Sequence, residues 1–251
     1  MEFMVSVPQT ARDSVFQPLQ VEGAVERIVR RLGEAIGSGV LRPGERLPPE
    51  LELAEMLDVA PMTLRQALAI LRDAGYVETR RGRGAGSFVA ADIAGPLGQG
   101  GRVPSERELV DLVDWRRAVS GEAAFLAAER ADADALDALS AAAAATERAA
   151  LGGFADYRLA DSGFHLAVAE AAGSPRLVAA EASLQAELGE ILAALPGTWS
   201  TDALRSSTSG HTPILASVLQ GRPEAARAAT LEHIEATRDW IVGLHLGRLS
   251  A

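Results

Sequence analysis

Two short helical segments followed at once by a glycine- and arginine-rich hairpin constrain the fold of this chain more than any other feature of its 251 residues. Pro48-Pro49-Glu50 predicts the start of the first segment, because proline is tolerated in a first helical turn and an acidic side chain complements the positive helix end. After a short break at 58–60, Pro61 predicts the start of a second helix, which Gly75 ends. Two short helices separated in this way are typical of a helix-turn-helix, although the spacing alone fits an ordinary αα-hairpin.

The hairpin favours the first of these interpretations. Residues 76–79 alternate like a strand, residues 87–89 are its predicted return, and 80–86 between them reads Arg-Arg-Gly-Arg-Gly-Ala-Gly. Glycines let a backbone approach DNA closely, and arginines meet phosphates or the minor groove, although a solvated loop with incidental charge is the alternative. Together with an amphipathic helix over 21–37, these segments predict a winged helix-turn-helix DNA-binding domain over 15–91.

The distribution of charge does not exclude DNA as a partner. The whole chain has a formal net charge of -10, but the acidic excess lies after residue 91, and basic and acidic residues balance over 11–91. No cysteine is present, which excludes disulfides and thiolate metal ligands. No apolar run is long enough to span a membrane, and the N-terminal segment lacks the layout of a signal peptide. We therefore expect a cytoplasmic protein with no membrane partner.

A second domain is expected after a glycine- and proline-rich linker at 92–104. From 105 to 248 the pattern is helical throughout, and Ser105 and Glu108 stand at the spacing of a capping box. One of the expected helices runs from 202 to 220. Helices joined by short connections favour an antiparallel bundle. The predicted fold is therefore mainly α: a winged helix-turn-helix with a small β-hairpin, followed by an all-α bundle.

Three of the four histidines and one aspartate form a candidate metal site. Asp161 and His165 are four residues apart on one predicted helix and therefore project from the same face. His211 and His233 lie on later helices, which can meet the first in a bundle core, where bundles usually assemble metal sites. Imidazoles and a carboxylate suit a borderline divalent ion, zinc first, with nickel or manganese as alternatives. Taken alone, Asp161 and His165 also fit a simple hydrogen-bonded pair, and His211 fits a helix cap.

The N-terminal segment resembles the DNA-binding domain of the GntR family over about residues 21–90. Three stretches carry the resemblance: GVLRPGERLPPELELAEML from Gly39, MTLRQALAILRDAGYV from Met62 and GRGAGSFV from Gly82. The resemblance implies that the helix from Pro61 enters the major groove and that the hairpin inserts beside it. The residues that it places on double-stranded operator DNA are Arg46, Thr63, Arg65, Gln66, Arg81, Arg83 and Gly84.

The helical segment resembles the ligand-binding FCD domain of the FadR-type branch of the same family, over about residues 107–246. Asp161-Ser-Gly-Phe-His165 matches its Asp-x-x-Phe-His element, and His211 and His233 match its other two ligand histidines. The resemblance therefore implies that these four residues hold a metal ion. It also implies that nearby arginines pair with the carboxylate of a small organic or sugar acid, the candidates being Arg116, Arg117 and Arg205.

Several positions depart from the family pattern. Ala60 and Pro61 stand where serine and arginine are usual, and Ala60 cannot cap a helix as serine would, a loss of about 1 kcal/mol that Pro61 partly offsets. Leu51 stands where a second arginine is common. We therefore expect an unusual operator or weaker binding to DNA. Ser120 and Gly210 replace frequent glutamates, so details of the ligand pocket are expected to differ.

Both resemblances together imply a bacterial transcription regulator and not an enzyme. We expect a homodimer, because two-fold proteins read palindromic operators. We also expect it to act as a repressor. The acid would stabilise one domain arrangement and so change the affinity for the operator. Two alternatives remain: a metal-dependent hydrolase, whose open metal would activate water, and a DNA-binding regulator whose metal is purely structural. Specific, salt-dependent binding to operator DNA would favour the regulator over the hydrolase.

Overall fold

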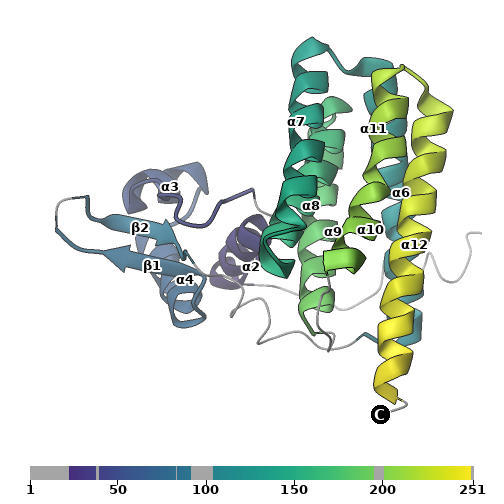
Figure 1. Ribbon diagram of the computed structural model, residues 1–251. Helices are drawn as coiled ribbons and strands as arrows, with labels where there is room; N and C mark the ends of the chain where they lie inside the picture. Colours follow the sequence, from purple (N-terminus) through teal and green to yellow (C-terminus); the bar gives the residue numbers. More distant parts are fainter. Residues whose placement is uncertain (1–22, 38–39, 83, 92–103, 195–200, 250–251) are drawn as a thin grey trace, which may run out of the picture.

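The computed structural model describes residues 23–37, 40–82, 84–91, 104–194 and 201–249. Figure 1 shows a small N-terminal part whose hairpin projects to one side of a tall bundle of helices. The predicted fold class, a mainly α chain with one short β-hairpin near its start, is confirmed. The predicted linker at 92–104 lies outside the described residues, apart from Pro104.

The N-terminal part is a winged helix-turn-helix. Its elements are α2 (Ala24–Gly37), α3 (Glu50–Met56), α4 (Pro61–Asp73), β1 (Val77–Arg80) and β2 (Gly86–Val89). The two strands pair antiparallel, with Val77 opposite Val89. Apolar side chains from the three helices and both strands form one core, which includes Ile36, Leu53, Leu64, Val77 and Val89. This core holds α4 and the hairpin in a fixed relation.

The helix starts show how local sequence sets the element boundaries. Ala60 occupies the N-cap position of α4 without a side-chain hydrogen bond, and Pro61 follows it, where a missing N–H costs nothing. The helix α6 (Glu106–Arg130) begins instead with the predicted capping box. The Ser105 N–H donates to Oε2 of Glu108 at 2.9 Å, and the Glu108 N–H donates to Oγ of Ser105 at 3.4 Å.

The bundle is built around α6, which packs against α8, α9, α11 and α12. Its other helices are α7 (Ala133–Ala149), α8 (Phe154–Ala171), α9 (Pro175–Ala194), α10 (Thr201–Ser209), α11 (His211–Leu219) and α12 (Pro223–Leu249). The single helix expected over 202–220 is in fact two, α10 and α11. Gly210 forms a turn between them, and Pro213 has no N–H to donate to the carbonyl of Ser209. None of the helices that the structure describes is long and apolar enough to cross a membrane.

The two parts touch where α2 packs against α9. Leu159 of α8 also packs against the N-terminal core. The helices α8 and α9 therefore belong to the bundle and also contact the DNA-binding part.

Candidate functional site

Three helices of the bundle bring one aspartate and three histidines together in its core. Asp161 and His165 lie one turn apart on α8, His211 begins α11, and His233 lies midway along α12. All four side chains are buried, and one candidate ligand atom from each lies within 4.8 Å of the others. Helical spacing accounts for the first pair. The remaining two residues join it because α8, α11 and α12 contribute to one hydrophobic core, which includes Phe164, Ile214 and Ala226.

This cluster, Asp161 with His165, His211 and His233, fits a metal ion. Ligand atoms bound at about 2.1 Å to one ion lie at most about 4.2 Å apart, so only a small contraction is needed. Both ring nitrogens of His211 are buried without a hydrogen-bond partner, although Nε2 lies 3.2 Å from Oδ1 of Asp161. Buried polar atoms are costly to leave unpaired, and an ion bound among these groups would remove that cost.

The surroundings of the cluster favour the protonation states that metal binding requires. Burial lowers the pKa of His165 and of His233 well below the usual imidazole value, so both rings are neutral at pH 7. Burial acts to raise the pKa of Asp161, but contact with His211 and the positive charge of Arg158 outweigh it. The pKa of Asp161 therefore falls well below the usual carboxyl value. The cluster thus offers an ionised carboxylate and the neutral imidazoles of His165 and His233.

Two neighbours fix the orientation of the histidine rings. Phe164 stacks on His211, with 4.2 Å between the ring centroids and 20° between the planes. Gly210 leaves space for His233: a Cβ at this position would lie 2.6 Å from Nδ1 of His233 and 3.2 Å from the carbonyl oxygen of Ser207. The glycine that departs from the family pattern therefore allows the ring of His233, a candidate metal ligand, to approach the start of α11.

If the four residues hold zinc as the sequence predicts, replacing Gly210 with alanine should lower the affinity for zinc by about tenfold or more, the range typical of residues that orient metal ligands. The added methyl group would displace the His233 ring, whereas the backbone (φ −67°) accepts alanine without strain. Competition with a chromogenic zinc indicator measures the change. The control is Gly163→Ala on α8, where a Cβ meets no atom within 4 Å and zinc affinity should be kept. Equal zinc affinities of the two variants would contradict the steric argument.

A buried arginine that the sequence analysis did not single out pairs with Oδ2 of Asp161, whereas His211 lies near the other carboxylate oxygen, Oδ1. Arg158, one turn earlier on α8, donates from Nη1 to Oδ2 of Asp161 and from Nη2 to Gln185 of α9. Gln185 donates to Glu181 at 2.7 Å, and Glu181 also accepts from the Ser120 hydroxyl at 2.7 Å. Burial raises the pKa of Glu181. The i, i+3 spacing of Arg158 and Asp161 is visible in the sequence. Exposed ion pairs on helices have the same spacing, so it does not indicate a buried pair.

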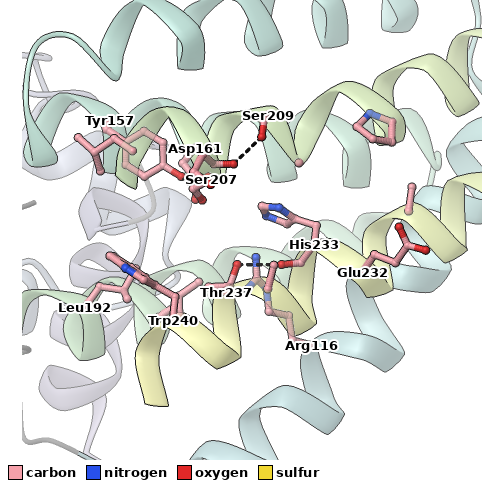
Figure 2. A pocket seen from close by; sticks show the side chains of 17 residues that line it. Arg116, Tyr157, Asp161, Leu192, Ser207, Ser209, Glu232, His233, Thr237 and Trp240 are labelled. Atoms are coloured by element: carbon pink, nitrogen blue, oxygen red, sulfur yellow. Dashed lines mark hydrogen bonds between the residues drawn. The ribbon is translucent and has the colours of Figure 1, made fainter. Parts of the chain in front are cut away.

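A cavity of about 380 Å³ opens beside this cluster of Asp161 and three histidines (Figure 2). Asp161, His233 and Arg116 line it where it meets the cluster. Arg116 is buried, its Nε has no hydrogen-bond partner, and its Nη2 lies 3.4 Å from Nε2 of His165. The other walls combine apolar side chains with hydroxyl groups, among them Leu188, Leu192, Leu204, Trp240, Ser206, Ser207, Ser209 and Thr237. The cavity thus presents a guanidinium beside the candidate metal ligands and an apolar surface further away.

The other two arginines predicted to bind an effector lie elsewhere. Arg117 is exposed on α6 and forms an ion pair with Glu235 of α12. Arg205 is exposed on α10, and neither arginine is among the described residues that line the cavity. Consecutive residues on a helix point about 100° apart, so α6 directs only one of its paired arginines into the cavity.

The predicted DNA-contacting residues of α4 lie near its start. Arg65 and Gln66 are exposed, and Thr63 is half-buried. Nε of Arg65 donates to Oε2 of Glu50, the first residue of α3, at 2.7 Å. Arg65 is therefore held at the surface between the two helices of the helix-turn-helix.

The remaining predicted DNA contacts belong to the wing or lie along it. Nη2 of Arg46 donates to the carbonyl of Ala85 at 2.9 Å, which lays this side chain along the hairpin. Arg81 and Gly84 are exposed at the tip, where Gly84 has a φ of +91° that favours glycine. Arg83 lies outside the described residues.

A winged helix-turn-helix joined to a helical bundle with a buried polar cluster and a cavity defines a transcription regulator with a ligand-binding domain. The chain belongs to the GntR family of bacterial regulatory proteins, whose description matches residues 24–86, and it carries an FCD domain, which matches residues 111–236. Members of this family bind operator DNA, and their FCD domain receives an effector. The chain is therefore a regulator and not an enzyme, and the hydrolase alternative is set aside.

Proteins that are similar over most of their length are transcription regulators. The HTH-type transcriptional regulator RmpR of Mycobacterium gastri is 37% identical over 238 residues, which cover 92% of this chain and 84% of that protein. The Uxu operon transcriptional regulator of Escherichia coli strain K12 is 30% identical, with 88% and 86% covered. Among solved structures, a GntR regulator from Rhodococcus sp. RHA1 has a TM-score of 0.50 at 26% identity, with 87% and 97% covered. E. coli McbR/YncC shares the fold, with a TM-score of 0.57 at 19% identity and 90% and 100% covered.

Proposed function

We propose that this chain is a metal-dependent transcription regulator that responds to a small organic acid in the cytoplasm and represses transcription as a homodimer on a palindromic operator. The observation that carries the proposal is the buried cluster of Asp161, His165, His211 and His233, which meets a cavity beside Arg116. A two-fold dimer would present two wings and two copies of α4 to two half-sites, as palindromic operators require.

Zinc is the first candidate for the ion, with nickel or manganese as alternatives, because the donors are imidazoles and one carboxylate. An ion held by these four residues would supply a positive charge with an open position for a ligand carboxylate. Arg116 would pair with the same carboxylate, since its Nε is buried without a partner and its side chain lines the cavity. A buried carboxylate that lacks one of its partners is costly. The acid is therefore expected to bind only when both the metal ion and Arg116 are present.

The walls of the cavity favour an acid with an apolar chain over a sugar acid. In Figure 2, Leu192 and Trp240 lie together at one end, away from Glu232, and Leu188 and Leu204 also line the cavity. An alkyl or aryl group buried there would gain roughly 25 cal/mol for each Å² removed from water. The many hydroxyls of a sugar acid would lose water against these apolar walls without enough partners.

Replacing Arg116 with methionine should abolish the rise in melting temperature that an acid causes in the zinc-loaded protein. Hexanoate and 2-hydroxyhexanoate test the apolar acids, gluconate and glucuronate the sugar acids, each with zinc and after chelation, since native-state ligands stabilise by mass action. Arg117→Met is the control, because Arg117 pairs with Glu235 outside the cavity and its response should match that of the wild type.

Three results would overturn parts of the proposal. Stabilisation by the sugar acids alone would contradict the argument from the apolar walls. A melting temperature that falls on chelation but responds to no acid would leave the metal purely structural. A melting temperature and an operator affinity that both ignore zinc and chelator would remove the metal from the proposal.

A further inference from the structure

Arg158 connects the metal cluster to the helix on which the DNA-binding part lies. Its guanidinium is 3% exposed, and its Nη1 donates to Oδ2 of Asp161. Its Nη2 donates to the backbone carbonyl of Gln185 at 3.0 Å and to Oε1 of the same residue at 2.5 Å. One rigid, forked group therefore holds both a candidate metal ligand on α8 and the backbone of α9.

The same stretch of α9 meets the DNA-binding part. A Cβ placed on Gly189, one turn beyond Gln185, would lie 3.7 Å from Nε of Arg158 and 4.0 Å from the carbonyl oxygen of Gly37. Gly37 is the last residue of α2. Arg158, α9 and the end of α2 thus converge at one glycine, where an added Cβ would lie in van der Waals contact with both neighbours.

Two further observations show that this contact belongs to the boundary between the domains. Leu159, the neighbour of Arg158 on α8, packs against the core of the winged helix. A second cavity, of about 340 Å³, lies beside the contact and is lined by Gly33, Gly37, Tyr76, Ala186 and Glu187. The boundary therefore combines a direct contact between α2 and α9 with a cavity beside it.

We infer that Arg158 is a positioning residue that couples occupancy of the metal site to the seating of α2, and hence of the DNA-binding part, on α9. This inference rests on the proposed function, because it assumes that Asp161 is a metal ligand. The carboxylate of Asp161 carries one negative charge. A bound metal ion would neutralise part of that charge and so weaken the ion pair between Asp161 and Arg158. The hold of Arg158 on α9 then changes, and by linkage the position of α2 feeds back on metal affinity.

The test compares the wild type with Arg158→Met as full-length chains. Fluorescence anisotropy gives the Kd for an operator fragment, selected by the wild type from random-sequence DNA, at saturating zinc and after chelation. We expect the two Kd values of the wild type to differ by about tenfold, within the usual range of allosteric coupling. In Arg158→Met the two values should agree within about twofold, while a zinc indicator still reports stoichiometric binding. Arg130→Met is the control: Arg130 donates to the carbonyl of Ala172, and this variant should keep the wild-type ratio.

A second variant and a second measurement make the result independent of any folding defect in Arg158→Met. Gln185→Met removes one of the two bonds by which Arg158 holds α9, so the ratio of Kd values should fall to less than half its wild-type value. Hydrogen–deuterium exchange of the α2 amides should respond to zinc in the wild type and in Arg130→Met, but not in Arg158→Met. Wild-type ratios and wild-type exchange in both Arg158→Met and Gln185→Met would overturn the inference. A wild type whose operator affinity ignores zinc would instead overturn the proposed function.

Discussion

The His211→Ala variant is expected to lose zinc affinity by at least about a hundredfold while remaining folded. His211 is one of four candidate ligands, and loss of a group that merely orients a ligand already costs ten- to a hundredfold. Its ring nitrogens have no hydrogen-bond partner, so alanine leaves no donor or acceptor of another residue unpaired at these atoms. Zinc at a thousand times its wild-type Kd should stabilise the wild type by about 4 kcal/mol, and a hundredfold loss of affinity should remove roughly 3 kcal/mol of this gain in the variant. Competition with a zinc indicator and thermal melts with and without chelator measure both effects.

The control for this experiment is Thr230→Ala on α12. Thr230 is buried like His211, but its hydroxyl donates to the carbonyl of Ala226 in its own helix. This variant should lose some stability through packing and keep its affinity for zinc. If His211→Ala and Thr230→Ala bind zinc equally well, the cluster does not hold the metal. If chelator changes the melting temperature of neither variant, metal binding contributes nothing to stability.

Features that depend on neighbours in the sequence could be predicted from the sequence. The hairpin of the wing follows from glycines at a tip flanked by alternating residues, and the start of α6 follows from the capping-box spacing of Ser105 and Glu108. The pairing of Asp161 with His165 follows from one helical turn. Each of these features is decided within a few residues, where backbone geometry leaves few alternatives.

Features that depend on tertiary packing could not be predicted in the same way. Arg116 and Arg117 are equivalent in the sequence, and only the rotation of α6 against α12 buries the first and exposes the second. The link from Arg158 to Gln185 joins two helices whose side-by-side placement is not encoded in any spacing. Gly210 and Pro213 do mark the break between α10 and α11 in the sequence, but a single glycine or a proline in a first helical turn is also compatible with one continuous helix, so the two short helices are settled only by the fold.

Replacing Arg65 with alanine should weaken operator binding by about tenfold to a hundredfold, the cost of losing one good contact to a base edge. Arg65 is exposed near the start of α4, the end of a recognition helix that meets the bases. Glu50 now pairs with this arginine at 2.7 Å. Glu50→Gln should therefore strengthen operator binding by a few-fold, because it frees Arg65 and removes a negative charge near the DNA. Fluorescence anisotropy on the selected operator fragment at several salt concentrations measures both changes.

Arg72→Ala provides the matched control on the same helix. Arg72 lies in the last turn of α4, and its Nη1 donates to Oγ1 of Thr79 in the wing at 3.1 Å, so it is bound to the protein and remote from the reading end. Its loss should change operator affinity by less than about threefold. If Arg72→Ala weakens binding as much as Arg65→Ala, the N-terminal end of α4 does not read the bases. If Glu50→Gln weakens binding instead of strengthening it, the ion pair orients Arg65 for the operator, because an arginine fixed by its partner loses less entropy on binding than a free one.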